Sequence, residues 1–253
     1  MNATALDQSR LDVVAKTRSN IFNWRGQFTP QFVDYILDSF AISGQQVLDP
    51  FCGSGTVLLE SATKGLAAVG CEINPAAYAM TKFISLANDN PTARLESFAR
   101  VEEAILRLGG NYHDMPLLEG ESNFRQRYKN LLDFARDLFT GMERKRDLLI
   151  ALIILIRAES SGRGDLMPVV RRACASVKSD LTNLPYVKPS IRAVLCDARE
   201  VHRILRASTD LILTSPPYIN VFNYHQNHRA LLEVLGFDLL KVAESEIGSN
   251  RKN

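Results

Sequence analysis

The stretch Gln45-Gln-Val-Leu-Asp-Pro-Phe-Cys-Gly-Ser-Gly-Thr56 carries the pattern that decides the fold. Gln45 to Asp49 reads as a short strand, followed by a glycine-containing loop and a helix that begins at Thr56. Glycines allow close approach of the backbone to a ligand, and a helix N-terminus presents free N–H groups. The loop lacks the lysine of a phosphate-binding loop and the third glycine of a dinucleotide-binding loop. The acid beside it favours a positively charged ligand, although the turn alone is also compatible with a purely structural role.

Strands and helices alternate on both sides of this stretch. Thr29-Pro30 predicts a helix start, with a hydroxyl cap followed by proline at the first helical position. Leu66 to Cys71 reads as a second strand, and a helix is expected from Pro75 to about Asn88. Strands return at Ile191 to Cys196 and at Leu211 to Thr214. This alternation is typical of a parallel α/β sheet, here with only four strands.

Residues 91–189 interrupt the alternation with long amphipathic segments and no convincing strand. The clearest predicted helices there are Phe124 to Phe139 and Asp147 to Glu159, and the second is apolar nearly all round, which indicates burial in a helical cluster. We therefore expect a helical insertion in an α/β domain. The predicted organisation is an N-terminal arm that packs late or not at all (1–20), an α/β domain (21–90 and 190–225), the helical insertion (91–189), and C-terminal helices with a basic tail (226–253).

Composition places the chain among globular proteins. It has 253 residues, 46% of them hydrophobic, and a net charge of +2 that neither requires nor excludes a nucleic-acid partner. The longest apolar run, Leu148 to Ile156, is about half of what a bilayer span needs, and no secretory signal is visible. We expect a soluble, cytoplasmic protein. The cysteines show no paired spacing, so neither a structural zinc site nor a disulfide framework is expected: Cys52, Cys71, Cys174 and Cys196.

Acidic residues follow three of the predicted strands. Asp49 ends the first, Glu72 the second and Asp197 the third. A carboxylate at the C-terminal edge of a parallel sheet is placed to accept hydrogen bonds from ribose hydroxyls. Any one of these acids is a routine helix cap, but three along one edge favour a ligand-binding crevice.

The fourth strand runs into Thr214-Ser-Pro-Pro-Tyr218. Two successive prolines cannot continue a strand ladder or occupy a helix interior, so they hold the backbone extended and rigid. An ordinary diproline turn is the alternative. Beside a ligand crevice, the rigid placement of a hydroxyl, a carbonyl and an aromatic ring indicates chemistry.

The Asp49–Thr56 stretch together with Thr214–Tyr218 resembles the S-adenosylmethionine (SAM)-dependent amino-methyltransferases of DNA. The resemblance is closest to those that methylate the exocyclic amine of cytosine. Gly26-Gln-Phe-Thr-Pro-Gln31 resembles the segment of that family that contacts the methionine end of the cofactor. The resemblance covers roughly residues 20–90 and 190–225 and implies a Rossmann-like methyltransferase sheet.

The resemblance implies that one group of residues surrounds SAM: Phe28, Thr29, Asp49, Phe51, Gly53, Gly55, Thr56, Glu72, Ile73 and Asp197. Phe28 and Thr29 would approach the methionine moiety. Glu72 would hold the ribose, Ile73 would pack on the adenine, and Asp197 would accept a hydrogen bond from the adenine amine. No metal is expected to take part.

The catalytic residues implied by the resemblance are Ser215, Pro216, Pro217 and Tyr218. An aromatic amine is a poor nucleophile because its lone pair is delocalised into the ring. Acceptance of its hydrogens by the Ser215 hydroxyl and the Pro216 carbonyl would favour a pyramidal nitrogen with the lone pair aimed at the methyl group. Tyr218 would stack on a cytosine flipped out of the DNA duplex.

These expectations describe a site-specific DNA (cytosine-N4) methyltransferase, of the kind found in restriction-modification systems. Two alternatives stay open: a methyltransferase acting on RNA or protein amines, and a binding subunit that cannot turn over alone. His225 and His228 have a spacing that could hold metal, but ordinary polar contacts or contacts to DNA are the simpler interpretation.

The sheets of this family normally have seven strands, with the fourth near the middle. Leu211 to Thr214 is apolar on both faces, which is typical of a central strand, yet here it would form an open edge. An exposed apolar edge invites pairing with another chain. We therefore expect a second polypeptide, or a homologous copy, to complete a split or truncated enzyme.

Overall fold

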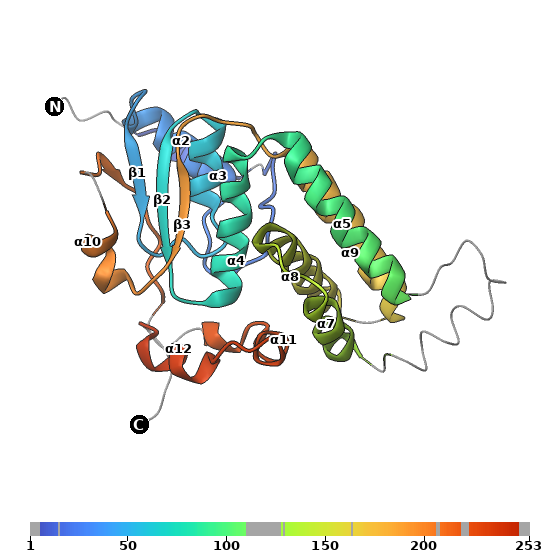
Figure 1. Ribbon diagram of the computed structural model, residues 1–253. Helices are drawn as coiled ribbons and strands as arrows, with labels where there is room; N and C mark the ends of the chain where they lie inside the picture. Colours follow the sequence, from blue (N-terminus) through green and yellow to red (C-terminus); the bar gives the residue numbers. More distant parts are fainter. Residues whose placement is uncertain are drawn as a thin grey trace. The chain divides into compact units, whose positions relative to one another are not determined.

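The computed structural model describes residues 6–14, 16–109, 128, 130–162, 164–205, 208–218 and 223–247 (Figure 1). The chain forms two compact units. The sheet unit comprises residues 1–88, 185–225 and 241–253, and the helical unit comprises residues 89–184 and 226–240.

The sheet unit is built on four parallel strands in the order β3-β2-β1-β4. Their bounds are Gln46–Asp49 (β1), Ala67–Glu72 (β2), Ile191–Leu195 (β3) and Leu211–Ile212 (β4). Val47 in β1 lies in register with Ala68 on one side and Leu211 on the other; Val47 and Ala68 are completely buried. The sheet confirms the predicted α/β class, with a Rossmann-like parallel arrangement.

β4 is shorter than predicted and forms the edge of the described sheet. It pairs with β1 through Leu211 and Ile212, and one further backbone bond runs from Leu213 N to Leu48 O, at 3.0 Å. Beyond this point the chain turns toward the prolines, whose nitrogens carry no hydrogen for a ladder bond. The strand therefore ends where the diproline segment begins.

Helices that follow β1 and β2 cover the sheet. α3 (Thr56–Thr63) packs on β1 and β2, and α4 (Pro75–Ile84) packs on β2 and β3. The remaining elements of this part of the chain are α1 (Gln8–Leu11), α2 (Pro30–Phe40), η1 (Ser85–Asn88), η2 (Ala198–Glu200) and α10 (Val201–Ile204). Because α3 and α4 each follow a strand directly, their N-termini lie at the carboxyl ends of β1 and β2.

The helical unit buries α8 (Lys145–Ser160) at its centre. Residues 150–156 of α8 are all buried, as expected for a helix that is apolar nearly all round. α8 packs against α5 (Pro91–Gly109), α7 (Leu131–Thr140) and α9 (Leu166–Asn183), and α11 (Arg229–Val234) packs on α7. The start of the helix predicted at Phe124 lies outside the described residues.

The C-terminal region also contains η3 (Tyr224–Gln226) and α12 (Leu239–Ser245). The sequence assigned residues 226–253 to one region, whereas residues 226–240 group with the helical unit and residues 241–253 with the sheet unit. Among the described helices, none combines the length and apolar composition needed to cross a bilayer.

The N-terminal arm makes specific contacts, unlike the loose arm that its polar composition suggested. The backbone nitrogen of Asp7 donates to the Tyr35 hydroxyl at 2.6 Å. The guanidinium of Arg18 makes two hydrogen bonds, at 3.1 and 2.9 Å, to the carboxylate of Glu60, which is almost completely buried. A buried carboxylate requires a partner, and the arm supplies it.

The start of α2 departs from the sequence expectation in one respect. Thr29 occupies the N-cap position before Pro30, as predicted, but its hydroxyl makes no capping hydrogen bond. The buried Oγ1 has no hydrogen-bond partner among the described residues. The hydroxyl oxygen of Thr29 is therefore a polar atom without a described hydrogen-bond partner, within the segment predicted to contact the cofactor.

Candidate functional site

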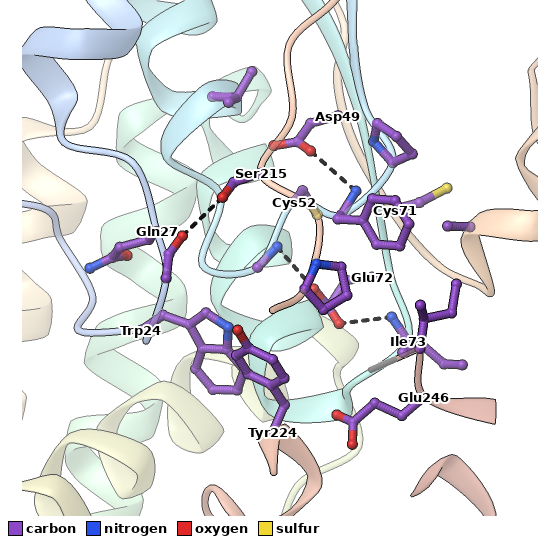
Figure 2. Close-up of a pocket in the computed structure, with 18 of the residues that line it drawn as sticks. Trp24, Gln27, Asp49, Cys52, Cys71, Glu72, Ile73, Ser215, Tyr224 and Glu246 are labelled. Carbon is purple, nitrogen blue, oxygen red and sulfur yellow. Dashed lines mark hydrogen bonds between the residues drawn. The ribbon is translucent and has the colours of Figure 1, made fainter. Parts of the chain in front are cut away.

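A cavity of about 800 Å³, counting the open space at its mouth, lies at the carboxyl ends of β1 and β2 within the sheet unit (Figure 2). Its walls come from residues 24–28, 49–53, 56–57, 71–73, 196–198, 215, 217, 224 and 245–247. The three acids predicted at the strand ends, Asp49, Glu72 and Asp197, therefore share one cavity.

Asp49 ends β1 and is only 3% exposed. Its Oδ1 accepts a hydrogen bond from the Thr214 hydroxyl at 2.7 Å and another from the Phe51 backbone nitrogen at 3.1 Å. Burial raises the pKa of Asp49 to about 7, although both hydrogen bonds lower it. A buried carboxylate in this state is stabilised in its ionised form by a cation bound nearby.

Glu72 ends β2 and is held by three backbone donors. Its Oε2 accepts from Gly53 N at 2.9 Å, and its Oε1 accepts from Ile73 N at 2.9 Å and Asn74 N at 2.8 Å. Burial raises the pKa of Glu72 to about 7 against the effect of these bonds. The bonds fix the carboxylate within the cavity, between the glycine loop and the start of α4.

The glycine loop adopts backbone conformations that other residues rarely reach. Gly53 has φ +51° and Gly55 has φ +89°. A Cβ on Gly53 would lie 3.1 Å from the Trp24 ring, and one on Gly55 would lie 3.1 Å from the Cα of Thr81. Both glycines are therefore required by conformation and by close packing.

Aromatic rings form another wall of the cavity. The rings of Trp24 and Tyr224 stack with centroids 6.0 Å apart and planes inclined by 22° (Figure 2). The amide of Asn74 fixes this arrangement by donating to Tyr224 O at 3.0 Å. The Trp24 ring also packs on Gly53 while it lines the cavity.

The diproline segment contacts the segment predicted to bind methionine. The Ser215 hydroxyl donates to Gly26 O at 3.1 Å. A Cβ on Gly26 would lie 3.0 Å from the Tyr218 ring, so that ring rests on the glycine. Ser215 and Pro217 line the cavity, whereas Pro216 and Tyr218 do not, and Tyr218 is 52% exposed.

Asp197 lines the cavity, but its carboxylate already accepts hydrogen bonds from Arg199. Its Oδ1 accepts from the backbone nitrogen of Arg199 at 2.9 Å and from Nε at 3.0 Å. Its Oδ2 accepts from the same Nε, at 3.0 Å, and from the terminal Nη2. The side-chain bonds from Arg199 are the main reason that the pKa of Asp197 is lowered. Asp197 thus also caps η2, the alternative considered for a single strand-end acid.

The C-terminal segment Ser245–Ile247 forms a wall that the sequence did not reveal. Nδ1 of His225 lies 2.8 Å from Oε2 of Glu246. His228 pairs instead with Glu159 in the helical unit. Among the described residues, no group of three or more His, Cys, Asp or Glu side chains is arranged to hold a metal ion.

Most residues predicted for the site lie on the cavity wall: Phe28, Asp49, Phe51, Gly53, Thr56, Glu72, Ile73, Asp197, Ser215 and Pro217. The others, Thr29, Gly55, Pro216 and Tyr218, are adjacent to these in the chain but do not line it. Wall residues that sequence reasoning did not assign to the site include Trp24, Gln27, Cys52, Cys71, Cys196, Tyr224 and Glu246. Gln27 and Cys52 stand inside the two N-terminal motif segments without an assigned role, and the other five come from segments without a recognisable motif, so only the folded chain places them on the wall.

Comparison with known proteins connects this cavity to DNA methylation. Residues 6–83 match the sequence profile of the DNA methylase family. The chain is 24% identical over 290 aligned residues to the Type II methyltransferase M.BsoBI of Geobacillus stearothermophilus, covering 91% of this chain and 55% of the relative. A segment of 55 residues is 38% identical to the Type II methyltransferase M.MjaII of Methanocaldococcus jannaschii, covering 22% of this chain and 10% of that relative. The chain thus spans about half the length of M.BsoBI. The matches confirm the resemblance to DNA amino-methyltransferases.

Proposed function

We propose that this chain, which resembles the DNA methylases, binds SAM in the cavity and transfers its methyl group to the N4 amine of cytosine in DNA. A role in restriction-modification is part of the proposal. The proposal rests on the contact between two segments that are far apart in the sequence. Thr214 donates to Asp49 from 165 positions away, and Ser215 lies in the same cavity as Asp49. A donor site and an acceptor site for methyl transfer would thus share one space.

The residues present fit SAM. The cofactor carries a methyl group activated by a cationic sulfonium, together with a cationic ammonium group. Asp49 and Glu72 offer buried carboxylates whose ionised forms a cation would stabilise. Phe28 and Ile73 give apolar surface, and Gly53, which has no side chain, contributes backbone to the wall.

Further cofactor-binding roles follow from the same proposal. Phe28 would contact the methionine moiety from the cavity wall, and Thr29, the next residue in the chain, is proposed for the same role on the resemblance alone, since it does not line the cavity. Phe51 and Thr56 would complete the cradle around the sugar and sulfur. Gly55 would act indirectly, because its left-handed conformation begins α3. Glu72 would accept from the ribose hydroxyls.

Ser215 would position the target amine. A hydroxyl donates one hydrogen bond and accepts two. Because the Ser215 hydrogen is already directed at Gly26 O, its lone pairs are left to accept from an amine. The Pro216 carbonyl would accept the second amine hydrogen, and Pro217 would keep this segment rigid. Such placement lowers a barrier by several kcal/mol without a covalent intermediate.

Tyr218 would hold the flipped base. Its ring rests on Gly26 at the edge of the site and is half exposed, so one surface is available for stacking. Stacking of a base on an aromatic side chain is worth about 1–3 kcal/mol, which offsets much of the cost of unstacking that base.

Substitution of Ser215 tests the proposal. Ser215→Ala should reduce methyl transfer to DNA at least tenfold while the dissociation constant for SAM stays within about twofold. Ser39→Ala, which removes a hydroxyl bonded to Tyr35 O on α2, is the matched control and should change neither quantity. Tritiated SAM offered to DNA, RNA and protein identifies the acceptor class. Label in RNA or protein alone, or equal loss of transfer and SAM affinity in Ser215→Ala, would contradict the proposal.

The edge formed by β4 supports a second part of the proposal. Among the described strands, β4 pairs with β1 only, and Ile212 in β4 is 62% exposed. We propose that a second polypeptide, or a homologous copy, pairs along this edge. Sedimentation analysis of the purified chain, with a parallel transfer assay, tests this: a stable and active monomer would refute it.

A further inference from the structure

We infer that Glu246, and not Asp197, is the carboxylate that recognises the adenine amino group of the cofactor. This inference rests on the proposed function, because it assumes that SAM occupies the cavity. It assigns a specificity-determining role to a residue in the C-terminal segment, beyond both motifs. Three observations carry it: the occupation of Asp197, the burial of Glu246 at the correct end of the cavity, and the hydrogen-bonding capacity that Glu246 retains.

Both oxygens of Asp197 are already engaged by Arg199. Three N–H groups of Arg199 reach them: the backbone N–H binds Oδ1, Nη2 binds Oδ2, and Nε is shared between the two. At most one of the about four acceptor sites of an ionised carboxylate is left. An adenine amine would have to compete with Arg199 to bind there. The sequence resemblance alone, which assigns this role to Asp197, does not reveal that competition.

Glu246 lies at the end of the cavity where the nucleoside would be. Figure 2 shows Glu246 next to Ile73, with Asp49 and Ser215 at the opposite end and Glu72 between them. Ile73 would pack on the adenine and Glu72 would hold the ribose. Glu246 is therefore on the adenine side, away from the sulfonium and the reacting groups.

The Glu246 side chain is built into the fold rather than exposed on the surface. It is 5% exposed, and His225, whose side chain is 11% exposed, contacts it at 2.8 Å through Oε2. Among the described residues, no hydrogen bond reaches Oε1. His225 thus orients the carboxylate and leaves one oxygen available to a donor from the cavity.

The chemistry of the base makes this contact selective. The exocyclic group of adenine donates hydrogen bonds, whereas hypoxanthine carries an oxygen at the same position. A buried carboxylate would accept from the amine but would face a second acceptor in hypoxanthine. Hydrogen bonds to charged groups, and the penalty for an unmatched buried acceptor, predict a preference for adenine of about tenfold to a hundredfold.

The test compares two ligands within each protein. Dissociation constants for S-adenosylhomocysteine and S-inosylhomocysteine are measured by calorimetry, and their ratio is taken. The wild type should prefer the adenine ligand at least tenfold. Glu246→Gln should bring the ratio close to one, because the amide both donates and accepts. Asp197→Asn should keep the wild-type ratio.

The chain offers a matched control in its other histidine–glutamate pair. Glu159→Gln alters the partner of His228 in the helical unit and should leave the ratio unchanged. General destabilisation lowers both affinities together and does not move the ratio. If Glu246→Gln binds neither ligand, Glu246→Asp, which withdraws the carboxylate by one methylene, should reduce the preference.

Three results would overturn the inference. The first is a full adenine preference in Glu246→Gln, or in Glu246→Asp if that variant is needed. The second is loss of the preference in Asp197→Asn. If the adenine ligand still binds in either case, the assignment of Glu246 fails but the proposed cofactor site stands. The third is a wild-type protein that binds neither ligand, which would remove the proposed function itself.

Discussion

The hydroxyl of Thr214 donates a hydrogen bond of 2.7 Å to Oδ1 of Asp49. The bond connects the segment that follows β4 to the end of β1, across 165 positions of sequence. Asp49 is 3% exposed, and a buried carboxylate is costly unless it is hydrogen-bonded. The contact therefore fixes the diproline segment to the loop of the candidate cofactor site.

Replacement of this hydroxyl should weaken the fold. Thr214→Val keeps the side-chain shape but removes the donor, and we expect the free energy of unfolding to fall by about 1–3 kcal/mol. Urea denaturation followed by circular dichroism measures it. Thr214→Ser retains the donor and should lose less than half as much. Equal losses in the two variants would show that packing of the methyl group contributes as much as the bond to Asp49, and a loss confined to Thr214→Ser would show that the bond does not stabilise the fold.

The stability of the ligand-free protein should depend on pH through Asp49. Its pKa is raised from 3.8 to about 7 by burial, so the folded state holds a proton that the unfolded state releases. This contribution to stability is fully present below the unfolded-state pKa and is lost as pH rises through about 7. The wild type should therefore lose on the order of 2–3 kcal/mol between pH 5 and pH 8 relative to Asp49→Asn, which cannot titrate.

Urea denaturation of both proteins at several pH values in this window checks that difference. The wild type should lose stability relative to Glu72→Gln over the same pH range, because burial also raises the pKa of Glu72 to about 7. A difference between wild type and Asp49→Asn that does not change with pH, or that changes in the opposite direction, would contradict the assigned burial of Asp49.

The two left-handed glycines at positions 55 and 44 allow a matched comparison. Their φ values are nearly equal, +89° and +88°, but a Cβ on Gly55 meets the Thr81 backbone at 3.1 Å, while one on Gly44 meets nothing within 4 Å. Gly44→Ala should show only the conformational cost, about 1 kcal/mol. Gly55→Ala should cost at least about 1 kcal/mol more, because backbone cannot move aside easily.

Thermal unfolding of these two variants gives the comparison directly. Gly55→Ala should also weaken SAM binding, since the turn it distorts lies between the cavity and α3. If both variants unfold at the same temperature, the close approach of the glycine loop to α4 does not contribute to stability.

Much of the sheet could be predicted from the sequence because its signals are local. Each strand is a short apolar run that ends beside an acid or a proline, and each such run pairs where parallel topology requires. Asp49, Glu72 and Ser215 could be placed in one site for the same reason, since carboxyl ends of parallel strands share one edge. The edge position of β4 also followed from the strand count.

The remaining parts of the site depend on tertiary contacts that no local pattern encodes. Thr29 looks like a capping residue, yet its hydroxyl makes no cap. Trp24 and Tyr224 stack although 200 positions separate them, and Glu246, on the cavity wall, contacts His225 from 21 positions away. Arg18 of the polar N-terminal arm pairs with a buried Glu60, a partner that the composition of the arm cannot reveal.

Equilibrium binding of SAM to the purified chain tests the central claim most directly, since all the described residues that line the cavity belong to the sheet unit. Calorimetry at pH 8, where Asp49 and Glu72 are largely ionised, should give saturable binding of one SAM per chain. Glu72→Ala should weaken this binding at least tenfold. Absence of saturable binding, or binding that Glu72→Ala leaves unchanged, would contradict the account.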